Sequence, residues 1–435
     1  MEKNIGMTHI KSVIKKIVPD IWIKKICRQK TKWWDISRQK KLYEKKIKTL
    51  KNKNRINIVF LLINADIWKY HELYLLLKKN EKYNPVVVIC PIMKKGEKYL
   101  KKNYTDCAEF CEERNYQYLH GYDLNLKRSI DVNKNVDVDI VLFGNPNTLS
   151  PSKIGHINID NCLACYMPYS FRIDTLYEYC YNKPFLNLMW RNFYESNIHK
   201  KLAAKHAMNG GENVVVTGFP KIDELRKSKG ISGIWQNSDK KKIVWAPHWT
   251  IKGFQNTGIN WSCFLDYCED IFEIAKYNSD KIEVALKPHP FLFNLLEKDN
   301  LWGKEKTKKY FEKWQKNENT HLVQGDYVEL LASSDALIHD SGSFLVEYLV
   351  FDKPVAYTVS NGDDLINRFN EFGKLAINEH HKIYNKQELK NFFLTVIKGD
   401  DPLAESRKSF RKKYLEIKGN SAAENIVEEL NNHFI

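Results

Sequence analysis

Polar side chains follow three short apolar segments in the C-terminal half of the chain. They are His248 after Ile243 to Ala246, Lys287 and His289 after Ile282 to Leu286, and Asp340-Ser-Gly-Ser343 after Ala336 to His339. Short apolar runs bounded by turn residues are typical of buried β-strands. Ligands of α/β proteins bind outside the carboxyl ends of such strands. The pattern therefore predicts one ligand site at which the three strand ends meet.

The second strand end suits an anionic ligand. Pro288 and Pro290 restrict the backbone on both sides of His289. The imidazole and the nearby ammonium of Lys287 are therefore held in a defined geometry, as a phosphate site requires. A neutral imidazole near pH 7 can also accept a hydroxyl proton. We therefore predict His289 and His248 as catalytic residues, in an order that the sequence leaves open.

The third strand end is followed directly by residues with helical apolar spacing. The N–H groups at a helix N-terminus favour anions, and a glycine there lets a ligand approach the backbone. A carboxylate one turn into the helix can accept hydrogen bonds from ribose hydroxyls. We predict that a nucleotide-activated substrate, the donor, binds here through its phosphates. The residues predicted to bind it are Lys287 from the second strand end and His339, Asp340, Ser341, Gly342, Ser343 and Glu347 from the third.

Each of these signals has a structural alternative. A histidine after a strand is often only a satisfied polar residue, and Ser-Gly-Ser before a helix is often only a cap. Polar groups at three successive strand ends of one domain are harder to explain by chance. Their convergence favours a functional site.

These strands belong to the second of two series in which short strands alternate with helical patterns. The first series occupies residues 55–226 and the second residues 240–384, and the polar stretch Lys227 to Lys242 contains the linker. A chain of 435 residues is long enough for two domains. We therefore expect an α/β protein with two facing Rossmann-like domains, a cleft between them, and C-terminal helices over residues 385–435.

Residues 1–54 form a basic arm. The first 55 residues hold 18 Lys and Arg against 4 Asp and Glu, so most of the chain's net charge of +16 lies there. Apolar residues from Ile10 to Ile17 have helical spacing, and a second helix can start near Asp20. A basic helix with tryptophans can lie on an anionic membrane surface. A structural arm is the second interpretation and nucleic-acid binding a distant third.

Two further features of the sequence limit the possible functions. Cys162 and Cys165 form a CxxC within an apolar strand, which favours buried thiols over zinc ligands, and no acidic cluster suggests a metal. The chain shows neither a signal-peptide h-region nor an apolar run long enough to span a bilayer. We expect an intracellular protein, peripheral on the inner membrane face, without a cofactor or metal.

The C-terminal domain resembles the CDP-glycerol glycerophosphotransferases, which build glycerol-phosphate polymers such as teichoic acids and capsules. The resemblance rests on Gly218-Phe-Pro-Lys-Ile-Asp223, Trp245-Ala-Pro-His-Trp249, Lys287-Pro-His-Pro290 and Asp335 to Pro354. It implies the GT-B fold, catalysis without a metal, and association with the inner membrane face. It also implies that Lys287 and His289 sit at the donor phosphates, that Ser341 to Ser343 cradle the diphosphate, and that Glu347 holds the ribose.

The N-terminal domain departs from the family pattern. Many members place His-Gly-Thr-Pro after the strand corresponding to Val138 to Phe143, and its histidine is a candidate base. Here the sequence is Phe143-Gly-Asn-Pro146, so His156 or His248 would have to substitute.

We expect transfer of glycerol phosphate, or of a related polyol phosphate, from CDP-glycerol to a hydroxyl of a lipid-linked or glycan acceptor, with release of CMP. The alternatives are a GT-B glycosyltransferase that uses a nucleotide sugar and a non-catalytic membrane scaffold.

Overall fold

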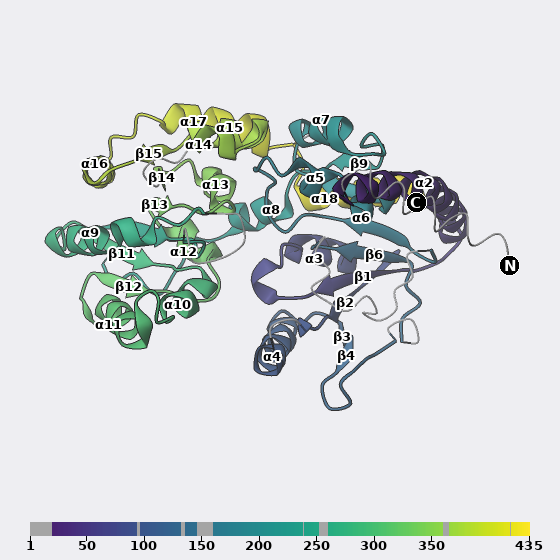
Figure 1. Ribbon diagram of the computed structural model, residues 1–435, viewed down its shortest axis with the longest axis horizontal. Helices are drawn as coiled ribbons and strands as arrows, with labels where there is room; N and C mark the ends of the chain where they lie inside the picture. Colours follow the sequence, from purple (N-terminus) through teal and green to yellow (C-terminus); the bar gives the residue numbers. More distant parts are fainter. Residues whose placement is uncertain are drawn as a thin grey trace.

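Two parallel β-sheets organise the chain (Figure 1). The computed structural model describes residues 20–93, 96–131, 135–145, 160–237, 239–251, 260–359, 365–417 and 419–435, with side chains from residue 35 onward except residue 366. The first sheet has the order β3-β2-β1-β6-β7-β8-β9 and the second the order β12-β11-β10-β13-β14-β15. Both follow the doubly wound pattern, in which the strand order reverses beside the first strand of each sheet. The expected α/β class with two Rossmann-like domains is confirmed.

The first sheet and its connections fill the N-terminal domain. Its strands are β1 (Ile56–Leu62), β2 (Tyr83–Ile89), β3 (Tyr118–His120), β6 (Ile140–Phe143), β7 (Leu163–Tyr166), β8 (Arg191–Tyr194) and β9 (Val214–Val216), with a small hairpin of β4 (Tyr122–Asp123) and β5 (Arg128–Ser129). Its helical elements are α2 (Asp20–Lys51), η1 (Ala65–Ile67), α3 (His71–Lys79), α4 (Glu97–Glu113), α5 (Tyr177–Tyr181), α6 (Pro184–Leu188), α7 (Asn197–His206) and α8 (Pro220–Lys227).

The second sheet forms the centre of the C-terminal domain. Its strands are β10 (Lys241–Ala246), β11 (Ile282–Leu286), β12 (Thr320–Leu322), β13 (Ala336–His339), β14 (Val355–Thr358) and β15 (His381–Ile383). The helical elements that follow are α9 (Phe264–Tyr277), α10 (Pro290–Leu296), α11 (Gly303–Lys316), α12 (Val328–Ser333), α13 (Phe344–Glu347), η4 (Tyr348–Phe351), α14 (Leu365–Arg368), α15 (Glu371–Asn378), α16 (Lys386–Lys398), α17 (Ala404–Phe410), η5 (Arg411–Leu415) and α18 (Ala422–Phe434).

Both faces of the second sheet are buried. Ile243 and Trp245 of β10 pack into one apolar cluster with α9, α10 and α11. Val244 and Ala246 point to the opposite face and pack into a second cluster with α12, α13 and α15. Successive side chains of a strand alternate between faces, so a strand covered on both sides is apolar throughout. This explains why the strands of this sheet are readable in the sequence.

The last helix returns to the N-terminal domain. Ala423, Ile426, Leu430 and Phe434 of α18 belong to the apolar core around the first sheet. The Asp223 carboxylate of α8 accepts hydrogen bonds from the backbone N–H groups of Ala422 and Ala423, at 3.1 and 3.0 Å. Figure 1 shows α18 beside α2, and α8 between the two lobes. The chain therefore passes from the first domain to the second and back.

The arm is a long helix that packs against its own domain. Helix α2 is described from Asp20 onward and covers the second helical stretch predicted from the sequence, whereas the helix expected over Ile10 to Ile17 lies outside the described residues. Tyr43 and Leu50 are buried in the N-terminal core, and Lys46 and Lys53 both pair with the buried Asp139. This packing supports the structural interpretation for residues 35–54. Within the described residues, no helix is long and apolar enough to cross a membrane.

The structure also differs from the sequence-based expectations locally. The helical spacing of apolar residues over Asp66 to Lys79 predicts one helix, but α3 starts at His71, because residues 65–67 form a short 3-10 turn capped by the Asn64 side chain. The sequence predicts no strand at β8 or β15, because Arg-Asn-Phe-Tyr and His-Lys-Ile contain no apolar run. Cys162 and Cys165 are buried in the N-terminal core, as predicted, and burial raises the pKa of the Cys162 thiol to about 12.

Candidate active site

The three strand ends singled out in the sequence lie side by side. Strands β11, β10 and β13 are neighbours in the sheet. The His289 backbone N–H donates to the Pro247 carbonyl at 3.1 Å, which joins the first two strand ends. The buried Asp340 carboxylate joins the third, because it accepts from the N–H groups of His248 at 2.5 Å and Cys263 at 2.7 Å. Asp340 therefore holds the surrounding loops, and both its oxygens are occupied.

The imidazoles of the three strand ends share one hydrogen-bonding pattern. In each, Nδ1 accepts from the backbone N–H two residues further on: Thr250 for His248 at 3.2 Å, Phe291 for His289 at 3.1 Å and Ser341 for His339 at 3.1 Å. A backbone N–H can only donate, so Nδ1 carries no proton and the neutral ring carries its proton on Nε2. Each neutral ring can therefore donate a hydrogen bond through its Nε2–H group.

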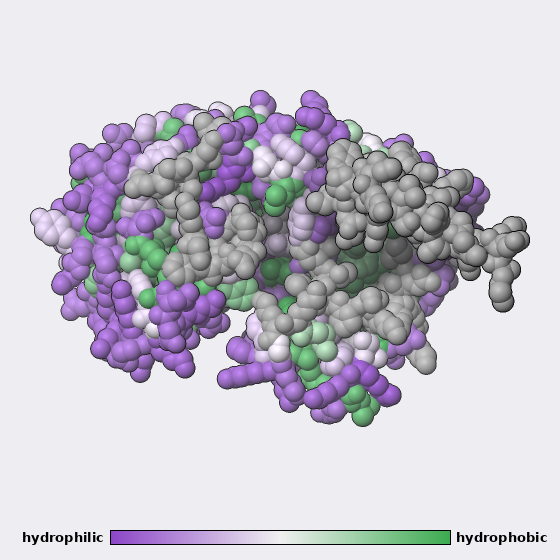
Figure 2. Space-filling model, in the orientation of Figure 1, coloured by the Kyte–Doolittle hydropathy of each residue, from purple (hydrophilic) through white to green (hydrophobic). Residues whose placement is uncertain are grey.

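The first two rings lie close together, edge to face. They belong to the left-hand lobe of Figure 2, which a notch in the surface separates from the right-hand lobe. The ring centroids of His248 and His289 are 5.0 Å apart, and Trp249 and Trp261 stand beside His248. Burial, with a smaller contribution from His289, lowers the pKa of His248 to about 3. Its imidazole is therefore neutral at physiological pH. The expectation that His248 and His289 accept a proton disagrees with this tautomer, because Nε2 already bears one.

His339 lies deeper than the other two. It is fully buried at the end of β13, and burial lowers its pKa to about 3. Its ring stands 5.3 Å from that of buried His380, and Nε2 of each ring lacks a hydrogen-bond partner within the described residues. His339 therefore orders the turn through Ser341 N–H rather than lining the surface of the site.

Lys287 presents a cation that the described residues leave uncompensated. Its side chain is 8% exposed, and no hydrogen bond or ion pair in the described part of the chain engages its ammonium. Burial lowers the pKa of Lys287, while Asp66 and Asp326 act in the opposite direction. A nearly buried ammonium without a close anion is suited to an anionic ligand.

The turn after β13 is tightly packed. A Cβ on Gly342 would lie 2.3 Å from the Trp261 ring, so only glycine fits beneath that indole. Ser341 is buried and Ser343 is partly exposed. The helix expected after Ser343 is short, because α13 ends at Glu347 and continues as the 3-10 turn η4. The backbone N–H groups of its first turn are free of intrahelical acceptors, but its dipole is weaker than a long helix would provide.

Glu347 lies on the side of this turn that meets the N-terminal domain. Its fully buried carboxylate accepts a hydrogen bond from the Tyr327 hydroxyl at 2.6 Å through Oε2. The Lys69 ammonium, from the N-terminal domain, lies 3.8 Å from Oε1 and donates to the same hydroxyl at 2.5 Å. Neither Lys69 nor Tyr327 was expected from the sequence, since nothing in their local patterns marks them.

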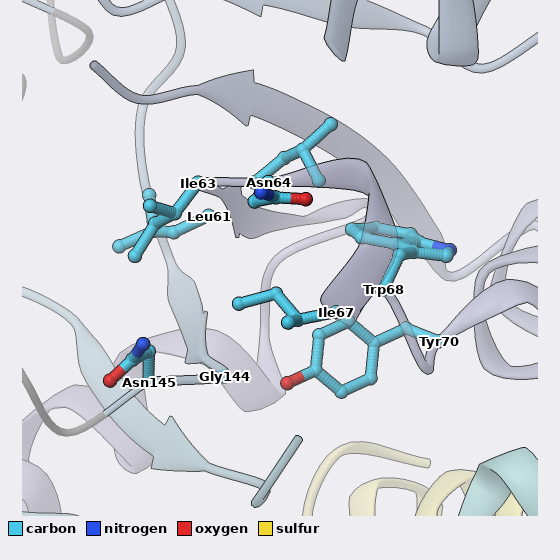
Figure 3. Close-up of a pocket in the computed structure, with 9 residues that line it drawn as sticks. Leu61, Ile63, Asn64, Ile67, Trp68, Tyr70, Gly144 and Asn145 are labelled. Carbon is cyan, nitrogen blue, oxygen red and sulfur yellow. The ribbon is translucent and has the colours of Figure 1, made fainter. Parts of the chain in front are cut away.

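The opposite domain offers a small pocket at its own strand-order reversal. Figure 3 shows Leu61, Ile63 and Asn64 at the end of β1 facing Gly144 and Asn145 after β6. The Tyr70 hydroxyl points toward Gly144 and donates to the Met167 carbonyl at 2.9 Å. A Cβ on Gly144 would lie 2.2 Å from that hydroxyl, so glycine is required there.

The position of the family's histidine is apolar here. Phe143 ends β6, and its ring packs edge-on against Phe185 with centroids 5.1 Å apart. His156, the other possible substitute, lies outside the described residues. The described residues contain no group of three or more His, Cys, Asp or Glu side chains arranged to hold a metal ion.

Comparisons with known proteins agree with this architecture. Among solved structures, the wall teichoic acid polymerase TagF is similar at 12% identity, with a TM-score of 0.57 over 95% of this chain and 97% of that chain. The UDP-GlcNAc 2-epimerase from Neisseria meningitidis bound to UDP-GlcNAc is similar at 16% identity, with a TM-score of 0.54 over 87% and 100% of the two chains. At such identities the likeness shows the fold, which is the expected GT-B arrangement.

The family assignment comes from the sequence. No curated protein matches the chain. The family model described as CDP-Glycerol:Poly(glycerophosphate) glycerophosphotransferase matches residues 186–432, which is more than half of the chain and includes all three strand ends. The resemblance seen in the motifs is thus confirmed: the chain belongs to the CDP-glycerol:poly(glycerophosphate) glycerophosphotransferase family and is a CDP-glycerol-dependent transferase.

Proposed function

We propose that the protein transfers glycerol phosphate from CDP-glycerol to a hydroxyl of a teichoic-acid-like polymer or other cell-surface glycan, and releases CMP. The observation that carries the site assignment is the nearly buried ammonium of Lys287, which has no close anion and lies at the same group of strand ends as two histidines that can donate through Nε2. These groups suit the two phosphates of the donor. The Glu347 carboxylate, whose Oε1 lacks a hydrogen-bond partner within the described residues, suits a ribose hydroxyl.

In the proposed reaction, the acceptor hydroxyl oxygen attacks the β-phosphorus, the bond from that phosphorus to the CMP oxygen breaks, and the hydroxyl proton passes to solvent. Charge on the phosphoryl oxygens and on the leaving CMP is stabilised by Lys287 and by the Nε2–H groups of His248 and His289. Hydrogen-bond donors that are already oriented in the free enzyme need no rearrangement as negative charge develops in the transition state. The two histidines remain our predicted catalytic residues, with hydrogen-bond donation in place of proton abstraction.

The absence of a histidine at Phe143 is compatible with this mechanism. Positioning of the reactants and electrostatic stabilisation of the phosphoryl oxygens are large contributions in enzymatic phosphoryl transfer. The cations and N–H donors of the C-terminal domain can supply them without a histidine at Phe143. The pocket beside Tyr70 and Gly144 lies at the carboxyl ends of β1 and β6, where α/β proteins bind ligands, and is our candidate for the acceptor end.

We also propose that α2 brings the protein to an anionic membrane surface on the cytoplasmic side. Lys41, Lys45 and Lys48 are exposed on one face of the helix, opposite the buried Tyr43 and Leu50. The apolar face of residues 35–51 is occupied by the N-terminal domain, so this part can attract a membrane only through charge. Binding to phosphatidylglycerol vesicles should therefore weaken as salt is raised above about 0.15 M. Salt-independent binding would contradict the proposal.

The test of function is release of labelled CMP from CDP-glycerol, measured with a glycerol-phosphate polymer as acceptor and with EDTA present. We expect CMP release that depends on the acceptor and survives the chelator. A panel of CDP-ribitol and UDP-sugars serves as the comparison. Release of UDP from a UDP-sugar, without CMP release from any CDP-polyol, would favour a glycosyltransferase. No nucleotide release from any donor would favour a scaffold.

A further inference from the structure

One contact joins the two domains beside the proposed nucleotide site. Lys69 lies between η1 and α3 of the N-terminal domain, whereas Tyr327 precedes α12 and Glu347 ends α13 of the C-terminal domain. The Lys69 ammonium donates to the Tyr327 hydroxyl at 2.5 Å, and that hydroxyl donates to Glu347 Oε2 at 2.6 Å. The three side chains therefore form a chain of hydrogen bonds that ends on a carboxylate.

This chain of bonds is buried but incomplete. Lys69 is 5% exposed and Glu347 is 0% exposed. The ammonium stands 3.8 Å from Glu347 Oε1, too far for a hydrogen bond, and Oε1 has no hydrogen-bond partner within the described residues. A buried carboxylate oxygen without a donor costs free energy, so it is a strong acceptor for any hydroxyl that reaches it.

The charges around Lys69 are arranged to keep the contact in place. The Lys221 ammonium lies 4.9 Å from the centre of the Tyr327 ring and also pairs with Glu224 at 2.8 Å. Burial lowers the pKa of Lys69 to about 8; Glu347, Glu224 and Asp326 oppose this shift, whereas Lys221 adds to it. Lys69 is therefore still largely a cation at pH 7, next to the carboxylate that it helps to hold.

We propose that Lys69 is a positioning residue for the nucleotide: through Tyr327 it fixes the Glu347 carboxylate with Oε1 turned to accept from a ribose hydroxyl. The inference rests on the proposed function, because it takes Glu347 as the ribose-binding group. Its new content is that ribose recognition by the C-terminal domain depends on a side chain of the opposite domain. Nucleotide binding is then coupled to the relative position of the two domains.

A purely structural tie between the domains would behave differently. Loss of such a tie would change stability, or the affinity for all nucleotides equally. Loss of a positioning residue should instead reduce the preference for a nucleotide that carries ribose hydroxyls. The informative quantity is therefore the ratio of the dissociation constants of 2′,3′-dideoxy-CMP and CMP.

The experiment measures this ratio by titration calorimetry on the full chain at pH 7. We expect a wild-type ratio well above one, and a ratio lowered by about five- to tenfold in both Lys69→Met and Tyr327→Phe, since a hydrogen bond to a charged group is the interaction being misplaced. Tyr327→Phe keeps the aromatic ring, so it carries the test if Lys69→Met fails to fold. Glu347→Gln should lower the ratio at least as much.

The matched control is Arg114→Met. Arg114, from the N-terminal domain, also pairs with a residue of the C-terminal domain, Asp326, at 3.5 Å, but does not touch Glu347. Its loss should leave the ratio unchanged. An equal fall in Arg114→Met would show a general effect of domain contact and overturn the inference.

A ratio lowered by Glu347→Gln but not by Lys69→Met or Tyr327→Phe would refute the role of Lys69 alone. A wild-type ratio of one would refute the ribose role of Glu347 and both claims with it, whereas failed transfer of glycerol phosphate with an intact ratio would refute only the reaction.

Discussion

Removal of the Lys287 ammonium should separate stability from ligand binding. The side chain is 8% exposed, and within the described residues no hydrogen bond or ion pair compensates its charge. A buried charge without a partner opposes folding, and methionine fills a similar volume without that charge. We therefore expect Lys287→Met to raise the free energy of unfolding by ~1 kcal/mol, as substitutions at strained functional sites commonly do.

The same substitution should weaken binding of the donor. One charge-assisted hydrogen bond to a phosphate oxygen contributes about 1.5–3 kcal/mol, which corresponds to a factor of roughly 10–150 in dissociation constant. Urea unfolding measures the first effect, and calorimetric titration of CDP-glycerol without acceptor measures the second. Both are made on the same preparation, so a misfolded variant is recognised at once.

Lys353 supplies the control. Its ammonium is also partly buried, but it donates to the Ala332 and Ser334 carbonyls, both at 2.6 Å. Lys353→Met should therefore destabilise the protein by about 1–3 kcal/mol, because two buried acceptors lose their donor, and should leave donor binding unchanged. Lys287 would not be a binding residue for an anionic ligand if Lys287→Met were as destabilising as Lys353→Met, or if it bound CDP-glycerol normally.

Three further outcomes are expected. Gly342→Ala should cost about 1–3 kcal/mol by overpacking against Trp261, and the added substitution Trp261→Leu should recover most of that loss in urea unfolding; no recovery would contradict the steric reason. His289→Gln should retain more CMP release than His289→Ala, because glutamine keeps an N–H donor but cannot act as a base; equal losses would restore the base hypothesis. Burial raises the pKa of Asp340 to about 7, above the value of the unfolded chain, so the folded state binds this proton more tightly. The protonated Asp340 carboxyl therefore stabilises the fold fully below about pH 4, and this stabilisation is lost as the pH rises through about 7. Asp340→Asn should remove that part of the pH dependence of unfolding, and an unchanged slope would show that the carboxyl is ionised throughout.

Strands were predictable from the sequence where both faces of the sheet are covered. The strand β10 is apolar throughout because Ile243 and Val244 meet different buried clusters. The strand β8 was not predictable, since it begins Arg191-Asn192 and has no apolar run. Asn192 is buried there, and its side-chain amide donates to the Leu186 carbonyl at 2.9 Å. A buried polar residue interrupts the apolar pattern from which a strand is recognised.

The meeting of the three strand ends could be anticipated for a related reason. His248 and Lys287 follow strands that are themselves recognisable, and adjacent parallel strands bring their ends to one edge. Lys69 and Tyr327 are 258 residues apart, and their contact depends on how the two domains meet. The tautomers of the histidines were equally hidden, because they are set by backbone N–H groups whose directions arise only in the folded turn.

The return of α18 to the first domain affects how the chain can fold during synthesis. The N-terminal core includes Ile426 and Leu430, so its apolar surface stays uncovered while the whole C-terminal domain is being made. The Asp223 carboxylate likewise lacks the backbone N–H groups of Ala422 and Ala423 until those residues have been made. The second domain can complete its own sheet before the first is sealed. A ribosome-bound chain that stops before residue 422 should therefore expose an apolar groove along the N-terminal domain, and this groove is where chaperones would be expected to bind.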